Sequence, residues 1–226
     1  MTTERLHLNV STRSGRVRVE AREGGGFAAE GADVSTDPDG SMHVTAAKGG
    51  SHSVDVVCPA GSDVIVGTAS GSVELVGSFG DVRVTTASGK ISIDRASSID
   101  VRTASGTIDI GECTGVCRVV TKSSRVRIRN VGNFDCSAVS GRVEVGDVED
   151  ASVRTVSGRV EMATRQTGRV EVRSVSGKIE VAVPRDRRPA TLLKSLSGRI
   201  RCDCETGDDG EISVATTSGT INVTCR

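Results

Sequence analysis

The chain has 226 residues, and its 29 lysines and arginines balance its 29 aspartates and glutamates. This neutral balance gives no global charge that would favour a nucleic acid or a membrane surface as partner. There are only three phenylalanines and neither tyrosine nor tryptophan, so the aromatic platforms on which single-stranded nucleic acid stacks are nearly absent. Composition therefore disfavours nucleic-acid binding.

Residues 1–8 lack the apolar segment of a signal peptide. No stretch reaches the roughly 20 apolar residues of a transmembrane helix. We therefore expect a cytoplasmic protein without a transmembrane segment. Seven cysteines without an export signal favour reduced thiols as the default state.

The first 60 residues combine one regular unit with an irregular segment. Alternating apolar residues surround Ser14-Gly15, whereas residues 20–60 contain glycine-rich and Asp-Pro turns between short alternating runs. Terminal repeats are usually atypical because they must cover an open core. We therefore expect residues 1–60 to form a first coil and an antiparallel β cap.

Residues 61–226 carry a Ser-Gly dipeptide every 17–21 residues, with alternating apolar residues on both sides. A fixed period indicates repeats that bury their apolar faces by stacking on their neighbours. The inward-facing apolar residues lie at even distances before the serine and at odd distances after it. This shift in the alternation predicts a corner at Ser-Gly, where glycine allows the bend. We therefore predict an all-β, single-domain parallel β-solenoid of about nine to ten coils. The serines are Ser70, Ser88, Ser105, Ser123 (followed by Ser124 in place of glycine), Ser140, Ser157, Ser176, Ser197 and Ser218.

A threonine or serine stands two residues before nearly every one of these serines, with Ala138 as the exception. Stacked coils would place such hydroxyls about 4.8 Å apart. We expect the resulting ladders to bond from coil to coil and to the corner backbone.

One passage of the chain reads Val54-Asp55-Val56-Val57-Cys58-Pro59-Ala60-Gly61-Ser62-Asp63-Val64-Ile65-Val66-Gly67-Thr68-Ala69-Ser70-Gly71-Ser72-Val73-Glu74-Leu75, and serial Thr-x-Ser-Gly units follow it. This pattern resembles the bacterial DUF4097 family. This family is also called "putative adhesin" or toastrack repeats, and the resemblance covers nearly the whole chain. It implies a β-solenoid of no established enzymatic activity, often attached to membrane helices and associated with envelope stress. This chain departs from that pattern because its sequence shows no membrane segment. The family offers no catalytic residues to carry over.

The sequence shows no motif for enzymatic chemistry. There is no Ser-His-Asp signature, phosphate-binding loop or dinucleotide fingerprint, and the three histidines have no metal-ligand spacing with Cys, Asp or Glu. We therefore expect no catalytic, cofactor-binding or metal-binding residues and no enzymatic activity. A polysaccharide-active β-helix enzyme is the weakest alternative, since only the solenoid itself favours it.

Basic residues occupy two columns that flank the predicted corner. They could form local ion pairs with outward carboxylates that keep the face soluble, or line an edge that binds an anionic polymer or membrane headgroups. Both interpretations remain open at this stage, and the second allows peripheral membrane contact. The residues of this predicted edge are Arg102, Arg125, Arg142, Arg154, Arg159, Arg173, Lys178, Lys194 and Arg199.

Cys204 and Cys225 each lie seven residues after the serine of their coil. A regular stack would therefore place their Cα atoms about 5 Å apart, within reach of a disulfide. A pair of reduced neighbouring thiols is the alternative, and a cytosolic location favours it.

Two features favour self-association. The position before the serine holds Val139, Val156, Val175 and Leu196, an apolar stripe suited to lateral contact. The last strand, with Ile221 and Val223, has no cap after it, so its open edge could template further pairing. We therefore expect a non-enzymatic structural or scaffold protein whose partner is itself, as a homo-oligomer or filament, or another protein.

Overall fold

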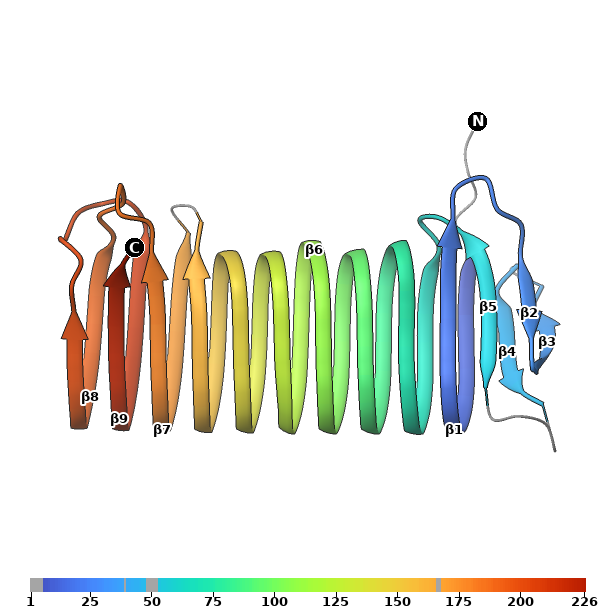
Figure 1. The fold of residues 1–226 in the computed structure, drawn as a ribbon, viewed down its shortest axis with the longest axis horizontal. Coiled ribbons are helices and arrows are strands. Elements are labelled where there is room, and N and C mark those ends of the chain that lie inside the picture. The colour runs from blue at the N-terminus through green and yellow to red at the C-terminus, as the bar shows by residue number, and fades with distance from the viewer. Residues whose placement is uncertain (1–5, 39, 48–52, 166–167) are drawn as a thin grey trace. The chain divides into compact units, whose positions relative to one another are not determined.

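The computed structural model describes residues 6–38, 40–47, 53–165 and 168–226. The described residues contain no helix and form one nine-stranded, mostly parallel sheet (Figure 1). The chain divides into two compact units, Met1–Cys113 and Thr114–Arg226. The 102-residue strand β6 (Asp63–Thr164) contributes to both units and forms successive coils within each of them. The predicted all-β solenoid is therefore confirmed, whereas the boundary between residues 60 and 61 stays a prediction.

The first unit begins with β1 (His7–Arg22), which is the first regular coil. β1 pairs in parallel with β6, and Ser14-Gly15 lies in register with Ser70-Gly71. Its other edge pairs in parallel with β4 (Met42–Ala46) and β5 (Val54–Pro59). The coil that comes first in the sequence therefore lies second in the stack of this unit.

Two short strands cover this end of the first unit. β2 (Ala28–Glu30) pairs antiparallel with β5, and β3 (Ala32–Thr36) pairs antiparallel with β4. The antiparallel cap expected from the sequence is therefore present in β2 and β3. Beneath it, the core side chains Val44, Val54 and Val56 are buried, as a covered core requires.

The second unit contains the end of β6, then β7 (Arg169–Val183), β8 (Ala190–Cys202) and β9 (Glu211–Cys225). β9 pairs in parallel with β7 along one edge and with β8 along the other. The spatial order is therefore β7-β9-β8, and the strand that comes last in the sequence lies inside the stack.

This insertion overturns the predicted exposed edge at the last strand. Ile221 and Val223 of β9 are both fully buried, so they cannot form the open surface expected from the sequence. The physical reason is that parallel coils with equivalent registers can stack in either order. The connections after β7 and β8 are longer than a corner. The first lets the chain skip the position next to β7 when it forms β8, and the second lets it return so that β9 fills that position.

Each corner is held by a local hydrogen bond. Thr103 Oγ1, for example, donates to the carbonyl of Ser105 at 2.9 Å, across the corner of its own coil. The same bond recurs at other corners, so hydroxyls there satisfy the corner backbone rather than linking coils. Bonds between coils are fewer, as from Thr216 Oγ1 to the carbonyl of Val175 at 3.3 Å. The predicted ladders are therefore mostly corner bonds within one coil.

Glycine is required at the corners because of close backbone approach. Gly89 has a φ of +142°, and an added Cβ would meet the carbonyl oxygen of Gly71 on the neighbouring coil. The coil that carries Ser124 in place of glycine has no positive φ at this residue. There, the hydroxyls of Thr121 and Ser124 hydrogen bond to each other at 2.6 Å.

Candidate functional site

An exposed row of apolar side chains runs along the corners of the second unit. We call it the corner stripe, and it consists of Val139, Val156, Val175 and Leu196. These side chains come from β6, β7 and β8, and they are 48–86% exposed. The exposure predicted for them from the sequence is confirmed, and their role in self-association stays a prediction.

The insertion of β9 changes the order of side chains along the stripe. Ser176 of β7 and Ser197 of β8 are both in register with Ser218 of β9. Thr217, which precedes Ser218, therefore lies between Val175 and Leu196. A polar residue thus separates Leu196 from the three valines, which the linear sequence does not reveal.

The outermost coil of the second unit, β8, leaves its core-facing side open. Ile200 and Cys202 of β8 are exposed, although they are in register with the buried Ile221 and Val223 of β9. Cys202 occupies the same position of its coil as the buried Val223, yet it is exposed because β8 has a neighbouring strand on one side only. The surface beside Ile200 forms an open hollow of about 740 Å³. Its lining includes Leu193, Lys194, Leu196, Ile200 and Thr217.

Most of the predicted basic edge is neutralised within its own coil. Arg142 contacts Glu144 at 3.3 Å and Lys178 contacts Glu180 at 2.7 Å, in each case two residues along the strand. Arg102, Arg159 and Arg173 are paired in the same way with Asp100, Glu161 and Glu171, respectively. The remaining four, Arg125, Arg154, Lys194 and Arg199, make no ion pair with another described residue. The structure therefore does not bring the nine cations together as one uncompensated edge.

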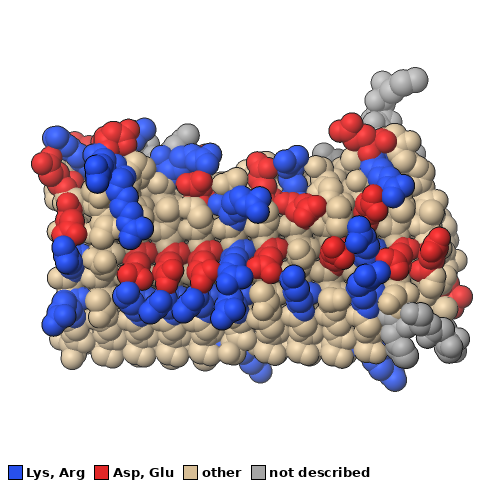
Figure 2. All heavy atoms as spheres, viewed as in Figure 1, with Lys and Arg blue, Asp and Glu red and all other residues tan. Residues whose placement is uncertain are grey.

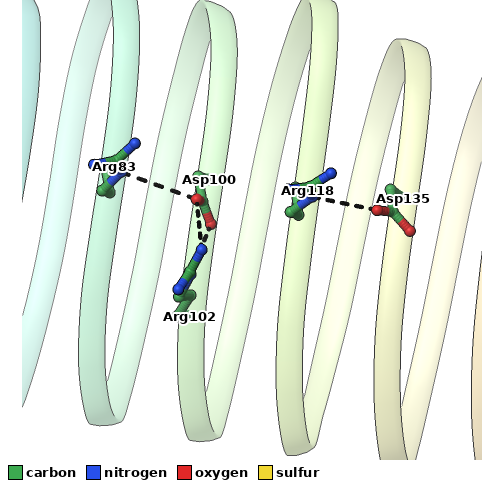
Figure 3. Close-up of polar contacts among 5 residues, drawn as sticks. All are labelled: Arg83, Asp100, Arg102, Arg118 and Asp135. Carbon is green, nitrogen blue, oxygen red and sulfur yellow. Dashed lines mark hydrogen bonds and ion pairs between the residues drawn. The ribbon is translucent and has the colours of Figure 1, made fainter.

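Further ion pairs connect neighbouring coils. In the first unit, Arg83 lies 3.9 Å from Asp100, which Arg102 also contacts (Figure 3). In the second unit, Arg118 donates to Asp135 at 3.3 Å (Figure 3). The partners are one coil of 17 residues apart in both cases. Within each unit, basic and acidic side chains consequently lie in adjacent rows (Figure 2).

The carboxylate of Glu144 is paired with arginines from two coils. It accepts a hydrogen bond of 2.8 Å from Arg127 on the preceding coil and one of 3.3 Å from Arg142 on its own coil. The hydrogen bond from Arg127 is the largest cause that lowers the pKa of Glu144. The carboxylate therefore stays charged and serves as a bridge between coils.

The structure joins Cys204 and Cys225 in a disulfide, with their Cα atoms 5.4 Å apart. The proximity predicted from their equivalent positions is confirmed because β8 stacks directly on β9. Burial raises the pKa of Cys136 to about 12, which keeps that thiol protonated. Cys58, Cys113 and Cys117 are also buried, whereas Cys202 is exposed beside the disulfide.

The histidines make local contacts. His43 hydrogen bonds to Asp37 at 2.7 Å, His7 lies 3.4 Å from Asp63, and His52 is outside the described residues. Among the residues that the structure describes, no three His, Cys, Asp or Glu side chains are grouped to hold a metal ion. No helix that could span a membrane is found in this part of the chain.

The sequence pattern of one family, described as Toastrack DUF4097, matches residues 2–225 of the chain. The chain belongs to the Toastrack DUF4097 family. No curated protein matches it. A crystal structure of a "putative cell adhesion protein" from Clostridium sporogenes is 9% identical to this Toastrack chain, with a TM-score of 0.26. The comparison covers 99% of the Toastrack chain and 93% of the clostridial chain.

Sequence reasoning missed the open coil β8 of this Toastrack protein. The available signal was composition, since Ala190–Cys202 contains three cations and no carboxylate, whereas Arg169–Val183 contains both. The long connections on either side of β8 were a second signal. Neither shows by itself which coil is outermost, because strand order depends on how the connections cross.

Proposed function

We propose that this Toastrack protein is a non-enzymatic structural or scaffold protein that self-associates or mediates assembly with another protein. The observation that carries the proposal is the corner stripe. Val139, Val156 and Val175 occupy equivalent positions on successive coils and remain about half exposed. Isolated exposed apolar residues are common, whereas a contiguous row favours a contact surface.

The charges around the stripe suit such a contact. Arg142, Arg159 and Lys178 follow the corners and are paired with carboxylates of their own coils. The cations that follow these corners are therefore locally neutralised, which lowers the electrostatic cost of bringing a second molecule close on that side of the stripe.

Binding of an anionic polymer or of membrane headgroups is the second candidate function. Arg125, Arg154, Lys194 and Arg199 support it, since they make no ion pair with another described residue. The pairing of the other five predicted cations weakens it. A polysaccharide-active enzyme receives less support, because outward carboxylates such as Glu144 are engaged by arginines.

Sedimentation velocity at increasing protein concentration tests the proposed function. We expect wild-type protein to exceed the 23.4 kDa of one chain as concentration rises, and Val156→Ser/Val175→Ser to associate less. Ile65→Ser is a matched control, since Ile65 is an exposed β-branched residue outside the stripe. A wild-type monomer at every concentration would contradict the proposal. Strong salt-dependent retention on heparin would instead favour anion binding.

A further inference from the structure

One edge of β8 has no strand beside it among the described residues. β8 pairs with β9 alone, through registers that run from Ala190 to Cys202. The N–H and C=O groups on its other edge are therefore available for pairing with an additional strand. β8 is 13 residues long, so this edge is longer than the short, protected edges that usually prevent association.

The open edge is basic. Lys194, Arg199 and Arg201 lie on β8, which contains no carboxylate. Their register partners on β9 are Ala215, Thr220 and Asn222, all neutral. Arg201 is paired with Asp203 at 3.1 Å, which leaves Lys194 and Arg199 without a counter-ion among the described residues. An added strand with carboxylates would complete the pattern seen between interior coils.

The cap strands of the first unit carry the opposite charge. Residues 23–47 contain five carboxylates and no lysine or arginine. Glu30 on β2 and Asp33 on β3 are exposed and make no ion pair with another described residue. β2 and β3 each pair with one strand only in the described chain. Val34, an exposed apolar residue, lies next to Asp33 on β3.

We propose that the open edge of β8 docks on the β2 and β3 cap strands of a second copy of this chain. This inference rests on the proposed self-association and names surfaces different from the corner stripe. Backbone pairing would supply the attraction, and Lys194 and Arg199 would meet Glu30 and Asp33. Because the two surfaces differ, the contact is heterologous, and each added copy presents a new β8 edge.

Charge argues against the symmetric alternative. Two β8 edges facing each other would bring Lys194 and Arg199 of one copy against the same cations of the other. Like charges directly opposite are destabilising in a sheet. The acidic cap edge is therefore the better partner for β8 than a second β8 edge.

A charge-swap experiment tests this docking. Variant A is Lys194→Glu/Arg199→Glu, and variant B is Glu30→Lys/Asp33→Lys. Each variant alone should associate at least about tenfold more weakly than wild type, because its reversed edge meets a like-charged partner. An equimolar mixture of A and B should recover association, since the acidic β8 of A fits the basic cap of B. Sedimentation velocity measures all four samples.

Lys90→Glu/Arg129→Glu is the matched control for variant A, since both side chains are exposed. It makes the same change in net charge at two other cations without an ion pair, away from β8, and should associate like wild type. Circular dichroism and the urea midpoint establish that each variant is folded. Should a variant fail to fold, the wild type is measured at about 0.05 M and 0.5 M NaCl, where docking through these charges should weaken with salt.

Several results would overturn the docking. The docking is wrong if variants A and B associate like wild type, or if their mixture fails to recover association. It is also wrong if the association of wild type is insensitive to salt. If the stripe variant Val156→Ser/Val175→Ser loses association while A and B keep it, the scaffold function stands and the β8 docking is wrong. A wild-type monomer would overturn both.

Discussion

Ile200 of β8 and Ile221 of β9 are register partners in adjacent parallel strands, yet Ile221 is fully buried and Ile200 is 42% exposed. The two side chains occupy the same position of their coils. The difference arises because β9 lies between two coils and β8 has a neighbour on one side only. Burial at a given position of the repeat therefore depends on the place of the coil in the stack.

Alanine substitutions at these two positions should have different effects. Ile221→Ala should lower the free energy of unfolding by about 2–4 kcal/mol, because it leaves a cavity in a packed core. Ile200→Ala should cost less than about 1 kcal/mol, as expected at a solvent-accessible position. Urea unfolding followed by circular dichroism measures both. Equal losses would contradict the strand order β7-β9-β8.

A methyl group at a corner glycine should be poorly tolerated. Gly158 has a φ of +142°, and its added Cβ would meet the backbone of Gly141. Gly158→Ala should therefore destabilise the protein by about 1–3 kcal/mol or more. Ser124→Gly, at a corner residue without a positive φ, should cost about 1 kcal/mol through the lost Thr121 bond and added chain entropy. Urea midpoints compare the two, and a neutral Gly158→Ala would contradict the close approach of the corners.

The bridge at Glu144 should contribute stability that depends on pH. The pKa of Glu144 is lowered in the folded protein, chiefly by the hydrogen bond from Arg127. The contribution is therefore fully present above the unfolded-state pKa, near 4.5, and is lost as the pH falls through the lower folded-state value. Glu144→Gln should remove up to about 1 kcal/mol at pH 7.

Below the folded-state pKa, the difference between wild type and Glu144→Gln should vanish. Urea midpoints of both proteins at several pH values measure this convergence. Lys178→Gln is a useful comparison, since its pair with Glu180 lies within one coil. A Glu144→Gln difference that persists at the lowest pH would show that the bridge does not act through its charge.

The sequence predicted the coil but not the stacking order. The Ser-Gly period and the alternating apolar residues depend on local backbone geometry and on burial, which every coil shares. Strand order depends instead on how the connections around β8 cross, and equivalent registers make β7 compatible with either β8 or β9. The sequence-based prediction therefore placed Ile221 at the surface, where the structure has Ile200.

The candidate surfaces were predictable to different degrees. Val139, Val156 and Val175 could be predicted as exposed because they lie beside the corner serine, outside both alternating inward sets. The basic columns could be located, but not their counter-ions, since whether Arg142 contacts Glu144 depends on side-chain conformation. The open edge of β8 could not be predicted without the position of β9.

Thiol chemistry tests both the disulfide and the exposed position of Cys202. In denaturant without reductant, the protein should show five thiols, because Cys204 and Cys225 are joined and the other five cysteines are outside that bond. Under native conditions, Cys202 should react first with a thiol reagent, whereas the buried Cys136, whose pKa burial raises to about 12, should be protected. Cys202→Ser should remove the fast reaction and leave the urea midpoint nearly unchanged.

Cys225→Ser should lower the free energy of unfolding by about 3 kcal/mol, since the cross-link closes a loop of 21 residues. Seven thiols without reductant would contradict the disulfide and support the reduced pair.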